Sequence, residues 1–293
     1  MMKTLKRWNV KEWLFFFLII PLILIIIYLL PQSTKDIFIL KTQHPTLVSI
    51  FLSNYTHSTF DHFKDNLVSY LIVMFLIFNI NTNKKIFYSI SLLNFIVVPI
   101  ISSLLTIFII SFLFSGPLSS HGFSAIVSAF VGYLPFSFFN YLKKLHPQEI
   151  SFGFFELFPR ITFTCAGWIY YNTTEIPIYN KNLILVCSIV LTVLSIHLIY
   201  TNKKEIKNVL KNIILKYFCF YNQKFSFWKM VMNIGFVIMF IIFLFPFWVI
   251  FPHQLIIEGG FSNVYAHFIG YCFGAFVPFI FKFDKRRKEA PQS

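Results

Sequence analysis

The chain has 293 residues, of which 57% are hydrophobic and only 12% are charged, and its mean hydropathy is +0.72. A soluble domain carries about 25% charged residues, so this composition excludes an ordinary soluble protein and predicts an all-α polytopic membrane protein. The net charge of +14 is expected from basic residues beside membrane helices on the cytoplasmic side, and not from nucleic-acid binding. A membrane β-barrel is excluded because its strands alternate over about ten residues, whereas the apolar runs here are continuous.

Eight apolar segments are long enough to be membrane helices. The first follows a basic stretch and has no small-residue cleavage site behind it, so we expect an uncleaved membrane helix. The fifth is the weakest, because Glu156, Pro159 and Arg160 interrupt it. Glu156 and Arg160 are spaced to neutralise each other on a helix, and a re-entrant or interfacial piece is the alternative. In chain order the predicted spans are 13–30, 63–80, 86–114, 122–142, 150–171, 182–200, 231–251 and 262–281.

The basic residues indicate an orientation. If the N-terminus is cytoplasmic and all eight segments cross, most of the 25 basic residues lie inside, as is typical of cytoplasmic loops. We therefore expect a single membrane domain over 1–293, in a multi-pass protein of the cell membrane with the lipid bilayer around it. Both termini are predicted to be cytoplasmic. The inner parts are the N-terminus at 1–12, a basic loop at 202–230 and a basic tail at 282–293.

Polar side chains inside membrane spans are costly and point to function. All three spans that carry such a group near the outer end run inward in this orientation, so the groups share one depth slightly below the outer surface. They are His62 and Asn66 at the second span, Ser124 on the fourth and His267 on the last, and His57 lies upstream of His62.

Small residues accompany the serine and the last histidine at helical spacing. Such stripes let two helix backbones approach closely, which would bring a serine hydroxyl within reach of an imidazole. The stripes are Gly122, Ala125, Ala129 and Gly132 on the fourth span, and Gly270 and Gly274 beside His267 on the last.

These residue types suit acyl transfer. A serine becomes an effective nucleophile when a base takes its proton, and a nearby histidine can do so. The negatively charged oxygen that forms during acyl transfer, the oxyanion, needs hydrogen-bond donors already in position. The candidates are His62, the Asn66 amide and the backbone N–H of Ser124, and the helix dipole supports them. No aspartate within the spans can orient His267, so a Ser-His dyad is expected. Neither a metal site nor a cofactor is expected, because there is no HExxH motif and the four cysteines show no CxxC spacing.

At these residues the sequence resembles the rhomboid family of intramembrane serine proteases. His57, His62 and Asn66 resemble the family's HxxxN helix with its upstream histidine, HGFSA at 121–125 resembles its GxSG motif, and AHFIGYCFG at 266–274 resembles its AHxxGxxxG helix. The resemblance implies Ser124 as nucleophile, His267 as general base, and an oxyanion hole of His62, Asn66 and the Ser124 amide. It further implies that His57, Gly122, Gly270 and Gly274 serve the motifs or helix packing. The substrates would be membrane proteins cleaved in or near their transmembrane segments.

Three features depart from the family pattern. Ala125 stands where the motif has glycine, and the outer loop at 31–61 lacks the Trp-Arg pair of many members. The family core has six helices, whereas eight segments are predicted here. We therefore expect core helices 1–4 within 13–142, an inserted helical hairpin at 150–200, and core helices 5 and 6 within 231–281. If 150–171 does not cross, Ser124 and His267 end on opposite sides of the membrane.

Two other interpretations stay open. The first concerns Ser124, which taken alone would be an N-capping hydroxyl at a helix start. The second concerns the whole protein, which could be a catalytically inactive rhomboid-like protein of the derlin or pseudoprotease type that binds membrane clients without cutting them. A transporter is disfavoured, because matched broken helices or repeats are not evident. Asn54 and Asn172 head glycosylation sequons on the predicted outer side.

Overall fold

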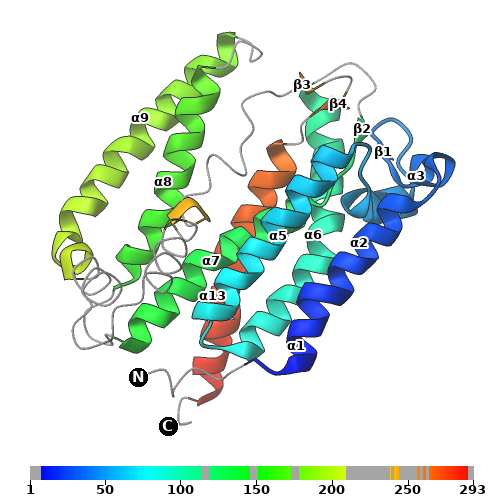
Figure 1. Cartoon of the computed structure of the whole chain (residues 1–293). Coiled ribbons are helices and arrows are strands. Elements are labelled where there is room, and N and C mark those ends of the chain that lie inside the picture. The colour runs from blue at the N-terminus through cyan, green and yellow to red at the C-terminus, as the bar shows by residue number, and fades with distance from the viewer. Residues whose placement is uncertain are drawn as a thin grey trace. The chain divides into compact units, whose positions relative to one another are not determined.

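The computed structural model describes residues 8–113, 119–145, 151–172, 178–208, 238, 241–243, 256–257, 260–261 and 264–289 (Figure 1). Helices dominate these residues, and the strands among them are two-residue ladders. Six of the helices are long and apolar enough to cross a membrane. The prediction of an all-α, multi-pass membrane protein is therefore confirmed at that level.

The six helices fall on six of the eight predicted spans. The helix over the predicted span 150–171 is present but is not among them, and the predicted span 231–251 lies outside the described residues except for 238 and 241–243. The six candidate spans are Val10–Leu29, Phe60–Ile80, Lys84–Phe108, Ser124–Lys144, Lys181–Thr201 and Val264–Phe281.

The chain divides into two compact units, Met1–Leu134 with Gln254–Ser293, and Pro135–His253. The predicted single-domain organisation stays a prediction. The first unit contains α1 (Val10–Leu14), the π-helical turn η2 (Phe15–Ile19), α2 (Ile20–Leu29), α3 (Gln32–Phe38), α4 (Leu47–Leu52), the 3₁₀ turn η3 (Ser53–Tyr55), α5 (Phe60–Ile80), α6 (Lys84–Leu113), the start of α7 (Ser124–Leu145) and α13 (Val264–Glu289). Its strands are β1 (Leu40–Lys41), β2 (Ser119–Ser120), β3 (Ile256–Ile257) and β4 (Gly260–Phe261).

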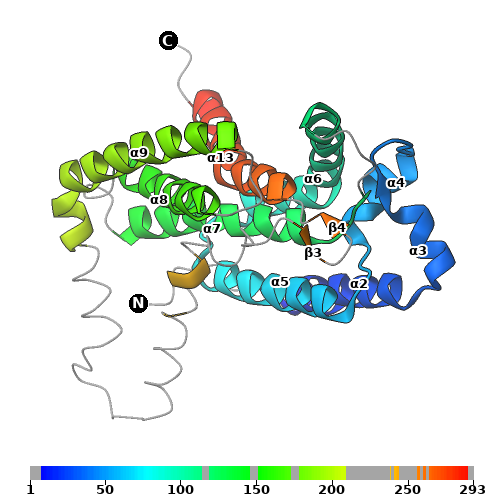
Figure 2. The same cartoon turned by 90° about the horizontal axis from the view of Figure 1, so that it is seen from above.

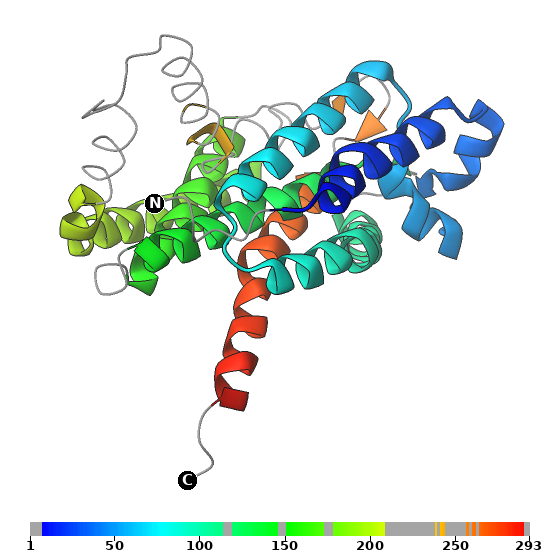
Figure 3. The same cartoon turned by 60° about the horizontal axis from the view of Figure 1, so that its bottom comes forward.

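Aromatic contacts hold the first helical rod against α5. Tyr28 stacks on Phe63 with ring centroids 4.6 Å apart, and Phe16 meets Phe78 edge-on at 5.5 Å. Because one pair lies near each end of α5, the rod formed by α1, η2 and α2 runs antiparallel beside it (Figure 3). Pro21 has no N–H to give to the helix ladder, and it is the second residue of α2, just after the π-helical turn where the register of that ladder changes.

The second unit contains a helical hairpin of α8 (Phe152–Tyr171) and α9 (Ile178–Thr201), which lie side by side (Figures 1 and 2). At one end the Ser151 hydroxyl donates to Asn202 over 3.1 Å. Toward the other end the Trp168 indole N–H donates to the Thr192 hydroxyl over 3.1 Å. The two helices are thus antiparallel and in contact over most of their length.

An ion pair sits in the middle of α8. Arg160 bonds Glu156 at 2.7 Å with the i, i+4 spacing of one helix face, and both side chains are about one third exposed. Pairing lets both charges stay on a membrane helix at lower cost than either would alone. Because α9 is a candidate span and α8 pairs with it from Ser151 to Trp168, we expect α8 to cross as well.

This expectation can be tested by cysteine accessibility in sealed vesicles, on a background with the native cysteines replaced by serine. Lys144→Cys and Lys203→Cys should react with a membrane-impermeant maleimide from the same side, and Asn172→Cys only from the opposite side. Labelling of Asn172→Cys from the Lys144 side would show that α8 does not cross.

Candidate functional site

Ser124 follows a short loop, residues 119–123, which we call the Ser124 turn. Its first two residues form β2, which pairs antiparallel with β1 so that Leu40 faces Ser120. The Gly122 N–H donates to the Ser53 carbonyl over 2.9 Å. Gly122 has φ +126°, and a Cβ there would lie 2.6 Å from Cε1 of His62. Only glycine fits this backbone and this contact, so the glycine of the predicted motif has a structural reason.

Histidines hold the rest of the turn. The Phe123 N–H donates to Nε2 of His57 over 3.2 Å, in a buried contact. His121 Nε2 lies 2.8 Å from the Ser58 hydroxyl. The His62 ring is edge-on to His57 with centroids 5.1 Å apart and is 6.1 Å from His121. Three imidazoles thus surround the turn.

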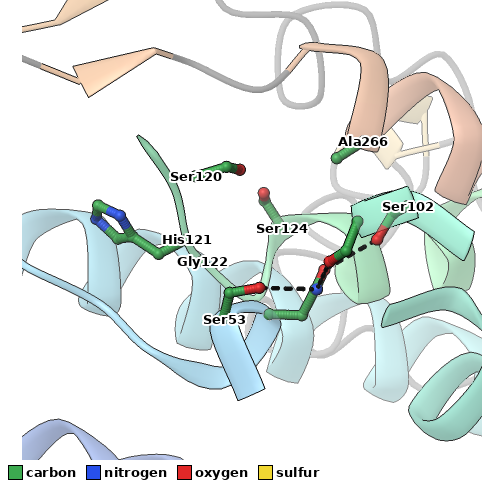
Figure 4. Close-up of a pocket in the computed structure, with 9 residues that line it drawn as sticks. Ser53, Ser102, Ser120, His121, Gly122, Ser124 and Ala266 are labelled. Atoms are coloured by element: carbon green, nitrogen blue, oxygen red, sulfur yellow. Dashed lines mark hydrogen bonds between the residues drawn. The ribbon is translucent and has the colours of Figure 1, made fainter. Parts of the chain in front are cut away.

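The helix start places Ser124 at the mouth of a small pocket. Ser124 is the first residue of α7, where backbone N–H groups have no carbonyl one turn earlier to bond. Its hydroxyl points toward the space between Ser120 and Ala266, while His121 is turned away from it (Figure 4). The described residues that line the pocket are Ser53, Asn54, Ser102, Ser103, Ser120, His121, Gly122, Ser124 and Ala266.

One wall of the pocket is a buried polar network centred on Asn54. The Asn54 amide donates to the Ser103 hydroxyl over 2.9 Å and to the Pro99 carbonyl over 3.2 Å, and it accepts from Ser102 over 3.1 Å. Asn54 is 6% exposed, so its sequon is not accessible for glycosylation in this fold. The sequence interpretation missed this wall. The signal available was Pro99 followed three and four residues later by Ser102 and Ser103 in the middle of α6.

Pro99 also ties η3 to α6. A proline inside a helix leaves the carbonyl four residues earlier without its usual donor. That carbonyl belongs to Phe95, and the Tyr55 hydroxyl donates to it. The segment that carries Asn54 and the backbone of Ser53 is therefore anchored at two adjacent points of one helix.

The start of α7 packs directly on α13 through glycine. A Cβ on Gly270 would lie 2.1 Å from the Ala125 carbonyl oxygen, and one on Gly274 would lie 1.8 Å from that of Ala129. A Cβ on Gly132 would meet the Tyr271 carbonyl oxygen at 2.1 Å. Equal steps of four along both helices mean that they run parallel, backbone against backbone. The glycines of the last predicted motif are thus packing residues.

The same register relates His267 to Ser124. His267 precedes Gly270 by three residues and Gly274 by seven, so all three share one face of α13. Since Gly270 meets Ala125, position 267 lies one turn earlier, level with the Ser124 turn. Its neighbour Ala266 lines the pocket, whereas His267, half-buried, is not among the described lining residues.

The two side chains predicted to donate to the oxyanion, His62 and Asn66, differ in their position relative to the pocket. The His62 ring abuts Gly122, next to the pocket. The Asn66 amide instead donates to the His62 carbonyl of its own helix over 2.9 Å, and Asn66 is not among the described lining residues. Ala125, the departure from the family motif, is buried at the contact with α13.

Burial keeps His57 and His121 uncharged at neutral pH. Burial, together with the neighbouring imidazoles of His62 and His121, lowers the pKa of His57 to about 3, against a smaller opposing effect of the Tyr55 backbone. Burial and His62 likewise lower the pKa of His121 to about 4. Despite these imidazoles, the described part of the chain holds no group of three or more metal-ligating side chains placed to bind an ion.

No protein-family model, no curated protein and no solved structure matches this chain. The resemblance to rhomboid proteases therefore rests on the motif residues alone.

The glycine contacts predict unequal effects of two similar substitutions. Gly274→Ala should lower the free energy of unfolding by about 2 kcal/mol, because its methyl group meets the Ala129 backbone, which cannot rotate away. Gly167→Ala is the matched control: its methyl group meets the Ser188 hydroxyl, which can rotate at the cost of its hydrogen bond to the Ile184 carbonyl, and helix propensity favours alanine by about 1 kcal/mol. Thermal unfolding in detergent measures both, and equal losses would contradict the packing of α7 on α13.

Proposed function

We propose that this chain is an intramembrane serine protease that cleaves peptide bonds in or near transmembrane segments of other membrane proteins, through a dyad of Ser124 and His267. The observation that carries the proposal is the parallel, glycine-mediated register of α7 and α13, which continues to the turn that begins at Ser119. The pocket in front of the Ser124 hydroxyl supports it further, because it is lined by polar side chains and has room for about one water molecule.

In this mechanism Ser124 Oγ attacks the carbonyl carbon of the scissile bond while His267 takes the hydroxyl proton. The negative charge that forms on the carbonyl oxygen is stabilised by the Ser124 N–H, which has no helix partner, and by the His62 ring next to Gly122. His267 then gives its proton to the leaving amine. Water attacks the acyl-enzyme in the second half, with His267 again as base, and Ser124 is regenerated.

The short strands suggest how a substrate is held. A transmembrane helix has every backbone group paired internally, so its scissile bond becomes accessible only after local unwinding. β2 and β4 lie side by side next to Ser124 without pairing to each other. Exposed strand edges bind extended peptides through backbone hydrogen bonds. Substrates whose segments contain small or helix-weakening residues would therefore be preferred.

Loss of the nucleophile should abolish covalent labelling. We expect wild type to react with a serine-directed fluorophosphonate, Ser124→Ala not to react, and His267→Ala to react about 10³-fold more slowly, because the hydroxyl loses its base. Ser120→Ala, which removes a hydroxyl from the same pocket, serves as control and should still label. Labelling that persists in Ser124→Ala would refute the nucleophile, and labelling without cleavage of any membrane substrate would favour an inactive, client-binding protein.

The two predicted side-chain donors should differ in their effect on turnover. His62→Ala is expected to lower kcat by about 10²-fold with little change in KM, as removal of an oxyanion donor does. Asn66→Ala should lower kcat by a smaller factor, since the Asn66 amide already donates to the His62 carbonyl. His44→Ala, at an exposed loop position, is the control, and His62→Ala behaving like it would remove His62 from the oxyanion hole.

A further inference from the structure

His57 lies beside the Ser124 turn and is only 1% exposed. Its Nε2 accepts the N–H of Phe123, the residue directly before Ser124. The neighbouring N–H of Gly122 donates to the Ser53 carbonyl. Both backbone donors directly upstream of Ser124 are therefore engaged within the protein, which leaves the Ser124 N–H at the helix start as the donor available to a reacting carbonyl.

The direction of this hydrogen bond defines the state of the His57 ring. A backbone N–H can only donate, so Nε2 must carry a free lone pair and the ring proton must sit on Nδ1. In a doubly protonated ring both nitrogens carry protons. The Nε2–H of His57 would then face the Phe123 N–H, and two donors cannot form a hydrogen bond with each other. The contact with Phe123 thus exists only while His57 is neutral.

The surroundings of His57 keep it neutral. His62 faces it from α5, His121 lies 6.1 Å from His62, and Tyr55 precedes it on η3, with its hydroxyl engaged at the Phe95 carbonyl. The carboxylate of Asp65 acts on this cluster through His62. Burial and the other imidazoles oppose a charge on His57, whose pKa lies at about 3.

We propose that His57 is a positioning residue for Ser124: its neutral imidazole holds the Phe123 N–H and so fixes the peptide geometry from which Ser124 attacks. This role rests on the proposed protease function. It differs from a packing role, because it requires an acceptor atom at the position of Nε2 and not merely a side chain of the right volume.

A pH dependence follows from this role. When the turn opens, His57 regains a histidine pKa near its ordinary value of 6.5. Between pH 6.5 and 3 the open form therefore binds a proton that the closed form does not. Acidification in that range raises the ratio of open to closed turn by up to tenfold per pH unit, and the closed turn is lost as the pH falls.

The test compares His57→Gln, which keeps an acceptor oxygen but cannot titrate, with His57→Leu, which keeps volume without an acceptor. Amide hydrogen exchange of the peptide 119–126 reports on the turn, and the fluorophosphonate labelling rate reports on Ser124. At neutral pH, His57→Leu should exchange at least tenfold faster and label at least tenfold more slowly than wild type, with His57→Gln close to wild type. At pH 5, wild type should open further than His57→Gln, while His121 titrates in both and cancels.

Three results would overturn the positioning role. They are wild-type behaviour of His57→Leu, equal impairment of both variants, and an identical acid response of His57→Gln and wild type. The last comparison does not need His57→Leu to fold. If wild type itself does not label, the protease function fails, and hydrogen exchange still decides whether His57 holds the turn.

Discussion

The close contact between α7 and α13 is the constraint on which the site depends. Gly270 and Gly274 have no side chain, and the atoms of α7 nearest to them are backbone atoms at Ala125 and Ala129, so backbone lies on backbone. Between membrane helices, where lipid removes the hydrophobic driving force, such contacts supply association through packing alone. A larger residue at Gly270 or Gly274 would push the two helices apart. The Ser124 turn would then move away from His267, which lies one turn before Gly270.

A second constraint is the need to pair polar groups in an apolar setting. Pro99 leaves the Phe95 carbonyl of α6 without a helix donor, and the Tyr55 hydroxyl supplies one. Asn54 bonds Ser102 and Ser103 of the same helix. Because an unpaired polar group is costly in such surroundings, these bonds fix η3 on α6. Through the Ser53 carbonyl, η3 in turn holds Gly122.

Much of the helical architecture could be predicted from the sequence, because a span of about twenty apolar residues has few alternatives in lipid. Helix ends shifted by a few residues where caps decide them: Thr59 accepts the His62 N–H and starts α5 at Phe60. α8 was the uncertain segment, and its hydropathy stays below that of the six spans. Its partner α9 shows why it forms a helix, since Trp168 and Ser151 bond across the hairpin.

The sequence by itself selected the residues of the proposed chemistry and assigned them to helices, because spacing of three, four and seven assigns side chains to helix faces. It could not show that the Asn66 amide turns back to the His62 carbonyl, that His57 accepts the Phe123 N–H, or that Asn54 forms a pocket wall. Those features join residues from different elements. Only the tertiary structure decides them, because a hydrogen bond depends on positions to within a few tenths of an ångström, which periodicity does not specify.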